Sequence, residues 1–385
     1  MSSFAFNTTP SIICGRGCSV KMPSTLGPGL GKRLLIVTDA GLVKLGLLDP
    51  ILAKFREANH ELVVYDGVDA DPPESNVMSA VAAAQSINAT GVIGIGGGSP
   101  MDVAKVAALL LGSKASLGDV YGVGVAQGPR IPLVLVPTTA GTGSEVTPIA
   151  ILTTGAAEKK GIVSKLLLPD VAVLDAELTL GLPAHITAAT GIDAMVHAIE
   201  AFSSASTSNN PISRGLARQA LQILGANIRD AVSLGTNVAA RESMLLGSML
   251  AGQAFANSPV AAVHALAYPI GAQFHVPHGL SNALVLPHVL RFNLDAASSA
   301  YCEIAADAFP ELLSVTKSDR ASRFIESLAA LSGELGLPSR LRDVGIPVTA
   351  LAKLAADAMK QTRLLVNNPR QVTESDALNI YQSAF

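Results

Sequence analysis

The residues best suited to chemistry in this chain are histidines that gather in one part of the sequence. Five of the seven histidines lie between His197 and His288. Asp193 and His197 stand four residues apart in a stretch with helical periodicity, so their side chains share one face. His264 and His278 follow in a second apolar segment. One carboxylate oxygen and three imidazole nitrogens can hold a divalent metal and leave one coordination position open.

The competing interpretation is that these histidines are structural. Spacing along the chain does not show that Asp193 and His264 meet in space, and a single buried histidine is usually only packed and hydrogen-bonded. His275, three residues before His278, could be a ligand, a proton carrier or a surface residue.

A second candidate site is the glycine-rich loop in GIGGGSPMDVAK, which closes a predicted strand and opens a predicted helix. Gly96, Gly97 and Gly98 would let the backbone approach a ligand closely. The helix N-terminus would then offer free N–H groups and its positive dipole end to a phosphate. We expect Ser99 to cap this helix and Asp102 to lie in its first turn.

This loop is neither of the two best-known phosphate loops. Ser99 stands where the dinucleotide fingerprint G-x-G-x-x-G has its third glycine, and the Lys-Ser/Thr pair of a P-loop is missing. A strand-to-helix turn without any ligand is the alternative.

A polar loop, PTTAGTGSE, follows the next predicted strand and contains Thr138, Thr139 and Thr142. Because parallel strands end at the same edge of a sheet, we expect both loops to open there and to favour a nucleotide. Asp39 ends the first strand of this region. A carboxylate at that place accepts hydrogen bonds from ribose hydroxyls and repels a 2′-phosphate, which predicts NAD rather than NADP. The alternative is a turn residue or a helix N-cap.

The predicted elements change character near residue 180. Short β-rich runs and helical stretches alternate before it, which indicates βαβ crossovers and a parallel sheet covered on both faces. The β-rich runs are 33–39, 62–68, 91–97 and 131–139, and the helical stretches are 41–58, 74–87 and 100–111. Three further apolar runs after Pro148 are expected to extend the edge of that sheet or to form a hairpin there.

Beyond this point long helical stretches dominate. They are 186–203, 212–234, 239–256, 298–307, 320–336 and 348–358. The predicted fold is therefore an α/β Rossmann-like N-terminal domain over 1–180 and an all-α C-terminal domain over 181–385. A pocket between two such domains is the default ligand site.

Composition excludes several other classes of protein. Lys and Arg total 27 against 30 Asp and Glu, and no basic run occurs, which disfavours nucleic-acid binding. Apolar residues make up 49% of the chain, yet no uninterrupted apolar run is long enough for a membrane span. Cys14, Cys18 and Cys302 form no C-x2-C pair, so neither a thiolate zinc site nor a disulfide framework is expected. The N-terminus lacks the pattern of a signal peptide, which predicts a cytoplasmic protein.

Taken together, the motifs resemble the iron-containing (group III) alcohol dehydrogenase family over essentially the whole chain. The resemblance rests on four ordered segments, GGGSPMDVAK, VPTTAGTGSEVT, GIDAMVHAIEAF and HALAYPIGAQFHVPHGLSNA. It implies the fold of that family, which is also dehydroquinate synthase-like, with the dinucleotide and the metal in the cleft. It implies NAD and Fe²⁺ as cofactors, with Zn²⁺ in some members, and reversible hydride transfer between NAD and a small alcohol, aldehyde or ketone.

The resemblance also implies roles for particular residues. Asp193, His197, His264 and His278 would ligate the metal. The predicted cofactor-binding residues are Asp39, Gly96, Gly97, Gly98, Ser99, Asp102, Thr138, Thr139, Thr142 and Lys160, with Lys159 as an alternative to Lys160.

One residue departs from the family pattern. Many members carry a second histidine four residues after the third ligand, often credited with proton relay, and Tyr268 stands at that position here. A phenol normally has a pKa of about 10 and is a poorer proton acceptor at pH 7 than histidine. Tyr268 and His275 are therefore the candidates for handling the proton. Together with Phe255 and Phe274, Tyr268 could also form apolar walls that suit a short primary alcohol, a diol or lactaldehyde.

Three other functions share part of this pattern. A sugar-phosphate lyase or dehydrogenase resembling dehydroquinate synthase would need Lys or Arg for the substrate phosphate, and the segment 264–278 contains neither. A hydroxyacid–oxoacid transhydrogenase would use the same site but retain its nucleotide between half-reactions. A metal hydrolase or a metal-binding protein would not need the two nucleotide-type loops. A homodimer is expected through an edge strand around 11–14, because exposed strand edges invite pairing.

Overall fold

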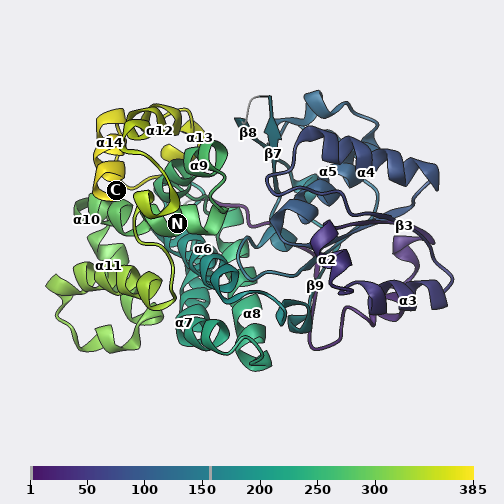
Figure 1. Ribbon diagram of the computed structural model, residues 1–385, viewed down its shortest axis with the longest axis horizontal. Coiled ribbons are helices and arrows are strands. Elements are labelled where there is room, and N and C mark those ends of the chain that lie inside the picture. The colour runs from purple at the N-terminus through teal and green to yellow at the C-terminus, as the bar shows by residue number, and fades with distance from the viewer. Residues whose placement is uncertain (1–2, 156–157) are drawn as a thin grey trace. The chain divides into compact units, whose positions relative to one another are not determined.

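The computed structural model describes residues 3–155 and 158–385. By its internal contacts the chain forms two units, which Figure 1 shows as ribbons. The α/β unit contains Asn7–Thr139 and Gly143–Leu180. The helical unit contains Gly181–Phe385 together with the short segments 3–6 and Ala140–Thr142.

A six-stranded parallel sheet in the order β1-β9-β6-β4-β2-β3 forms the centre of the α/β unit. Its strands are β1 (Ser11–Cys14), β2 (Arg33–Val37), β3 (Glu61–Tyr65), β4 (Gly91–Gly96), β6 (Leu133–Pro137) and β9 (Val171–Leu174). The helices of this unit are α1 (Met22–Thr25), α2 (Ala40–Lys44), α3 (Asp49–Glu57), α4 (Glu74–Ser86) and α5 (Gly98–Ser113).

Strand β2 shows why this sheet is covered on both faces. Leu34 and Ile36 pack with Phe55 of α3 in one apolar cluster. The alternate residues Leu35 and Val37 pack on the other side, with side chains of α4 and α5. Successive residues of a strand point to opposite faces, so an unbroken apolar strand must be buried on both sides. The predicted parallel sheet is confirmed.

Two details of this unit differ from the sequence prediction. The helix expected over 41–58 is broken into α2 and α3, with Gly46 between them at φ +68°. The runs after Pro148 do not all extend the main sheet. Strands β7 (Ile149–Thr154) and β8 (Glu158–Val163) pair as an antiparallel hairpin in a separate sheet with β5 (Gly122–Val123), whereas β9 lies inside the main sheet between β1 and β6. The apolar pattern identifies strands but not their partners.

The helical unit contains nine α-helices within its described residues. They are α6 (Ala184–Ser203), α7 (Pro211–Ser233), α8 (Val238–Asn257), α9 (Ala262–Phe274), α10 (His278–Ala308), α11 (Lys317–Glu334), α12 (Leu351–Ala358), α13 (Thr362–Leu365) and α14 (Glu374–Ser383). Helix α6 packs against α7, α8 and α10, and α10 also contacts α9. The predicted all-α character of this region is confirmed.

The sequence prediction missed α9, α13, α14 and the first twenty residues of α10. Pro269 lies inside α9 and Pro287 inside α10. A proline removes one backbone hydrogen bond and normally ends a helix, so the pattern looks broken at these places. Both helices are largely buried, and packing around the prolines maintains them.

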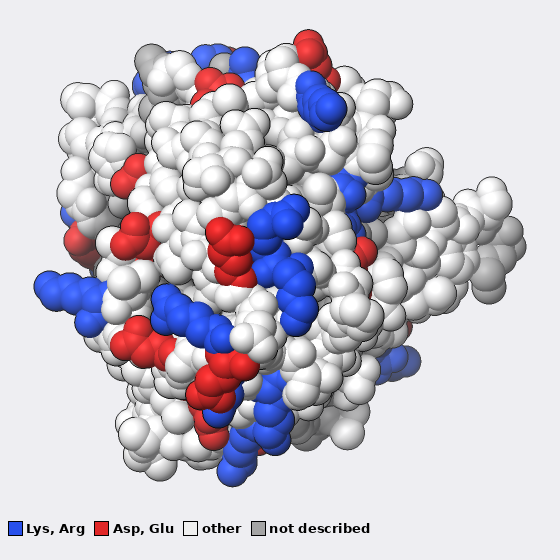
Figure 2. All heavy atoms as spheres, turned by 90° about the vertical axis from the view of Figure 1, so that its right-hand side faces the viewer, with Lys and Arg blue, Asp and Glu red and all other residues white. Residues whose placement is uncertain are grey.

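Charge is thinly spread over the surface. On the face drawn in Figure 2, Lys and Arg side chains lie intermixed with Asp and Glu between larger uncharged areas. Across residues 3–155 and 158–385, no helix has both the length and the apolar character required to cross a bilayer.

Candidate metal centre

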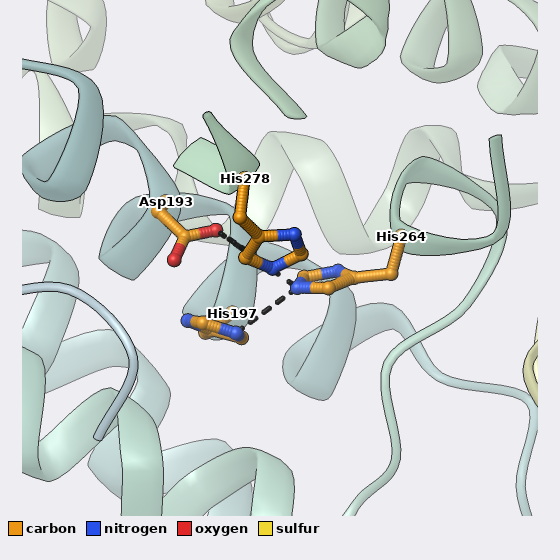
Figure 3. Close-up of side chains that lie close together, drawn as sticks. All are labelled: Asp193, His197, His264 and His278. Atoms are coloured by element: carbon orange, nitrogen blue, oxygen red, sulfur yellow. Dashed lines mark hydrogen bonds and ion pairs between the residues drawn. The ribbon is translucent and has the colours of Figure 1, made fainter. Parts of the chain in front are cut away.

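Three helices of the helical unit bring four metal-ligating side chains together. Asp193 and His197 come from α6, His264 from the first turn of α9 and His278 from the start of α10. Figure 3 shows the four side chains converging on one point, and their ligand atoms all lie within 4.8 Å of one another. Residues separated by up to 85 positions in the sequence therefore meet, which spacing alone could not show.

The distances between these atoms suit a small divalent ion. Asp193 Oδ1 lies 3.7 Å from His278 Nε2 and 4.0 Å from His264 Nε2, and the Nε2 atoms of His264 and His197 are 3.0 Å apart. A tetrahedral ion with bonds of about 2.1 Å separates its ligands by about 3.4 Å. Small side-chain adjustments would bring the four atoms to that separation.

The hydrogen bonds behind the histidines assign their tautomers. His197 Nδ1 lies 3.2 Å from the carbonyl oxygen of Gly141, and His264 Nδ1 lies 2.6 Å from Glu200 Oε2. A carbonyl oxygen and a carboxylate only accept hydrogen bonds, so both Nδ1 atoms carry the proton. Both Nε2 atoms then present lone pairs to each other at 3.0 Å. Two facing lone pairs repel unless a cation binds them, so this arrangement fits a metal ion.

The electrostatics also favour the metal-binding forms of His197 and Asp193. Burial lowers the pKa of His197 to about 3, which keeps the imidazole neutral. Burial alone would raise the pKa of Asp193, but the adjacent histidines and the Asn282 amide outweigh it and lower that pKa. Neutral imidazoles and an ionised carboxylate are the forms that bind metals.

Two further side chains complete the centre, and the sequence analysis singled out neither. Glu200 lies one turn after His197 on the same stripe of α6. Asn282 lies one turn after His278 on α10, and its Nδ2 donates to Asp193 Oδ1 at 2.6 Å. Oδ1 of Asn282 is buried and makes no hydrogen bond within the described residues. Helical spacing from a predicted ligand was the signal that could have found both.

Close packing of α10 on α6 brings His278 to Asp193. Gly279 lies between the two helices. A Cβ atom there would collide with the carbonyl oxygen of Ala189 and would lie 3.2 Å from Cβ of Asp193. Only glycine permits this approach without displacing α10.

Aromatic side chains lie beside the four ligands. Phe255 of α8 stacks on His197 with ring centres 4.3 Å apart, and the ring of Tyr268 is 5.8 Å from that of His278. Both were predicted as apolar walls. His275 ends α9 in a left-handed conformation with its side chain exposed, and it is not among the four grouped ligands.

The predicted nucleotide loops share one edge of the sheet in the α/β unit. Gly96 at the end of β4 is paired with Pro137 at the end of β6, and the Thr138 amide donates to the carbonyl of Gly96 at 2.9 Å. Asp39 follows β2, which lies beside β4. The prediction that these loops open together is confirmed. Ligands of open α/β sheets bind at this kind of edge.

Backbone geometry explains the glycines of the first loop. Gly96 has φ +153°, and a Cβ atom there would lie only 2.6 Å from the Pro100 ring. Helix α5 begins at Gly98 with Gly97 as its N-cap, so the expectation that Ser99 caps the helix is wrong. Because glycine has no side chain, the start of α5 has no side-chain cap, and the first N–H groups of this helix can bind another acceptor.

Asp102 is used inside the protein. Its Oδ1 accepts from Ser144 Oγ at 2.7 Å and its Oδ2 from the Ile151 amide at 2.9 Å. Lys105 of the same helix is fully buried and donates to Ser144, Thr147 and the Ile149 carbonyl. Asp102 therefore holds the second loop and β7 against α5. Its predicted contact with the cofactor stays a prediction.

The remaining residues predicted to bind the cofactor lie in the α2 cap, on β8 and in the second loop. Asp39 Oδ1 accepts from the Leu42 amide at 3.0 Å, so it is the N-cap of α2, as the alternative interpretation held. Lys159 forms an ion pair with Asp71 at 2.6 Å, while Lys160 lies exposed on β8. Thr138 is buried, and Thr139 and Thr142 are partly exposed.

A parallel α/β unit with a nucleotide-type edge and a helical unit with an Asp/His₃ centre define a class of metal-dependent, nucleotide-using enzymes. The comparisons with known proteins agree. The family model described as iron-containing alcohol dehydrogenase matches residues 9–176, and the model for the C-terminal part of the Fe-containing alcohol dehydrogenase family matches 187–385.

Individual relatives cover nearly the whole chain. A long-chain-alcohol dehydrogenase of Geobacillus thermodenitrificans is 40% identical over 92% of this chain and 90% of its own. The crystal structure of a 1,3-propanediol oxidoreductase superposes with a TM-score of 0.95 at 36% identity, covering 100% of both chains. The chain therefore belongs to the iron-containing alcohol dehydrogenase family and is an oxidoreductase of the alcohol dehydrogenase kind.

The relatives also bear on the cofactors. An NAD-dependent methanol dehydrogenase of Bacillus methanolicus is 32% identical over 98% of this chain and 99% of its own. A sulfoacetaldehyde reductase of Bifidobacterium kashiwanohense, solved with NAD⁺, superposes with a TM-score of 0.88 at 28% identity, covering 100% of this chain and 99% of its own. The predicted cofactors, NAD and iron, agree with the family and with the Asp/His₃ centre.

Proposed function

We propose that this enzyme catalyses reversible hydride transfer between NAD and a small alcohol or aldehyde at a divalent metal held by Asp193, His197, His264 and His278. The observation that carries this proposal is the 3.0 Å approach of the Nε2 atoms of His197 and His264, whose Nδ1 atoms both face acceptors, because one metal ion can bind both Nε2 atoms. Fe²⁺ is the metal expected from the family, and the same ligand set accepts Zn²⁺.

The chain's own residues would prepare the site for this reaction. When bound, the metal would supply Lewis-acid polarisation of the substrate oxygen, and NAD would supply the hydride acceptor. His197 and His264 are held for metal binding by burial and by hydrogen bonds at Nδ1, and Asp193 is held by burial and by the Asn282 amide. Phe255 and Tyr268 would orient the carbon chain of the substrate and exclude water from it.

The proton released from the alcohol needs an acceptor. Tyr268 lies beside His278, and its phenol would hydrogen-bond the substrate hydroxyl or a water that carries the proton to solvent. His275 is the second candidate, and its exposed position suits exchange with solvent.

NAD would bind along the edge formed by the two loops of the α/β unit. Its pyrophosphate would lie on the uncapped first turn of α5, at Gly97, Gly98 and Ser99. Asp39 has one carboxylate oxygen in the α2 cap, and the other would accept from the ribose. Thr138, Thr139, Thr142 and Lys160 would complete the contacts.

The relatives act on different substrates, so the substrate of this enzyme is proposed from the residues around its metal centre. Their names include long-chain alcohols, 1,3-propanediol, methanol and sulfoacetaldehyde. Two aromatic rings directly beside the ligands favour a small, largely apolar molecule. We propose a short primary alcohol or diol.

NADH formation with a panel of short alcohols and diols tests this function, with NADP in parallel. We expect metal-dependent NADH production with at least one substrate. NADP preference would contradict the role of Asp39. Activity on a hydroxyacid with an oxoacid acceptor and without added NAD would instead identify a transhydrogenase. Hydrolysis without NAD binding would overturn the redox function.

A further inference from the structure

Glu200 is a buried carboxylate whose two oxygens are both used at the start of α9. It is 4% exposed on α6, one turn after His197. Its Oε1 accepts from the Val263 amide at 2.7 Å, and its Oε2 lies 2.6 Å from His264 Nδ1. Among the described residues, no lysine or arginine forms an ion pair with it. A buried carboxylate needs compensating positive charge, and the metal centre lies one imidazole ring away.

The contact with Val263 ties the third ligand's helix to the helix of the first two. Helix α9 begins after Ala261, which offers no side-chain cap. Glu200 supplies the missing acceptor from α6, and its negative charge lies at the positive end of the α9 dipole. The first turn of α9, including His264, is thereby fixed relative to Asp193 and His197.

We propose that Glu200 is a positioning residue of the metal centre, whose carboxylate holds His264 in the tautomer that presents Nε2 to the metal. The inference rests on the metal-dependent function proposed above. An ionised carboxylate accepts only, so Nδ1 of His264 keeps the proton and Nε2 keeps its lone pair. The Gly141 carbonyl accepts from His197 Nδ1 and fixes the tautomer of that histidine in the same way. Such outer hydrogen bonds typically contribute about 10- to 100-fold to metal affinity.

Replacement by glutamine separates this role from mere support of the helix. In Glu200→Gln the amide oxygen can still accept from Val263, and the amide nitrogen then faces His264 Nδ1 as a donor. His264 must respond by accepting at Nδ1, which moves its proton to Nε2 and blocks the metal-binding atom. In Glu200→Ala the α9 cap is lost, but water can accept from Nδ1 and leave Nε2 available.

The two variants are therefore expected to rank in opposite orders for stability and for metal affinity. Zn²⁺ is the probe, with affinity measured by competition against a chromogenic chelator and Tm measured on the metal-free protein. We expect Glu200→Gln to melt above Glu200→Ala, yet to bind Zn²⁺ more weakly than Glu200→Ala and about 10-fold or more below the wild type.

A matched control is Asp307→Asn. Asp307 is another buried carboxylate of the helical unit, bonded to Arg218 and Gln222, and it lies about eight turns along α10 from His278. This substitution should lower Tm and leave Zn²⁺ affinity unchanged.

Three results would overturn the inference. Zn²⁺ affinity of Glu200→Gln within about threefold of the wild type would do so, as would weaker binding by Glu200→Ala than by Glu200→Gln in line with its Tm. If Glu200→Gln does not fold, ¹⁵N NMR of the histidines in the metal-free wild type decides, because a proton on Nε2 of His264 contradicts the proposal. A wild type that binds no Zn²⁺ would refute the proposed metal enzyme itself, so the two failures are distinguishable.

Discussion

Asp193, His197 and Glu200 recur at intervals of four and three residues along α6, so one helix face provides two proposed ligands and the proposed support of a third. The first two were predictable because aspartate and histidine at helical spacing are a metal-site signal. Glu200 was not, since a glutamate in a helix is usually solvent-exposed. Its role depends on α9 crossing beside α6, a tertiary contact that spacing within α6 does not reveal.

Asp39 combines a structural and a proposed recognition role, and Asp39→Asn separates them. Asparagine keeps the α2 cap because its side-chain oxygen still accepts from Leu42. The charge that would repel a 2′-phosphate is lost. We expect kcat/KM with NADP to rise about tenfold or more relative to NAD, while Tm stays within a few degrees. An unchanged cofactor ratio would place the 2′-phosphate discrimination elsewhere.

Glu145 should make stability depend on pH. It is fully buried, Oε1 has no hydrogen bond within the described chain, and burial raises its pKa from 4.5 to about 7. The folded state therefore binds the carboxyl proton of Glu145 more tightly than the unfolded state does. The stabilisation of the folded state that comes from this proton is lost as pH rises from 4.5 through 7. In Glu145→Gln this loss disappears, so the variant should gain about 3 kcal/mol relative to wild type between pH 4.5 and 8.

Urea unfolding of both proteins across this pH range measures the effect. Glu177→Gln is the control, because it removes a carboxylate of the same type at an exposed position. If the free energy of unfolding depends on pH in the same way for wild type and Glu145→Gln, folding does not raise the pKa of Glu145, which would contradict the prediction.

At the scale of elements, the α6–α10 contact decides whether His278 reaches Asp193. Gly279→Ala would place a methyl group against the Ala189 carbonyl and push α10 outward. We expect a loss of about 1–3 kcal/mol in the free energy of unfolding and weaker Zn²⁺ binding. Gly333→Ala in α11 meets nothing within 4 Å and should be neutral or stabilising by about 0.5–1 kcal/mol. Equal metal affinity in Gly279→Ala and wild type would show that the contact does not position His278.

Elements were predicted well where local pattern and packing agree, and poorly where packing overrides the pattern. The strands β2, β4 and β6 have apolar runs bounded by turn residues, and all three lie near their predicted positions. Helix α9 was missed and α10 was only partly predicted, because Pro269 and Pro287 normally end helices. These same helices carry two ligands, so the site was predicted from residue types before its supporting elements were.

At the scale of the whole molecule, the exposed edge of the main sheet supports the proposed homodimer. Among the described residues, β1 lies at the end of the sheet and pairs only with β9, and Ile12 on it is 36% exposed. Ile12→Lys places a charge on this edge, which opposes strand pairing. We expect a dimer for wild type and a monomer for the variant in sedimentation velocity. A variant that remains dimeric would show that the chains associate through another surface.

Strand order also belongs to this scale and marks the limit of the sequence prediction. Each strand's own residues identify it as a strand, but β1 and β9 pair across about 160 residues. Nothing local in either strand encodes that partner. The separation of the β7–β8 hairpin from the main sheet is likewise a product of the complete fold.

The central claim is that the Asp/His₃ centre binds one catalytic metal, and reconstitution of metal-free protein tests it most directly. Fe²⁺ or Zn²⁺ would be titrated while bound metal and NADH formation are measured together. The account predicts that activity rises in proportion to bound metal up to one ion per chain, and that His264→Ala shows neither. Full activity in metal-free protein, or in His264→Ala, would contradict it.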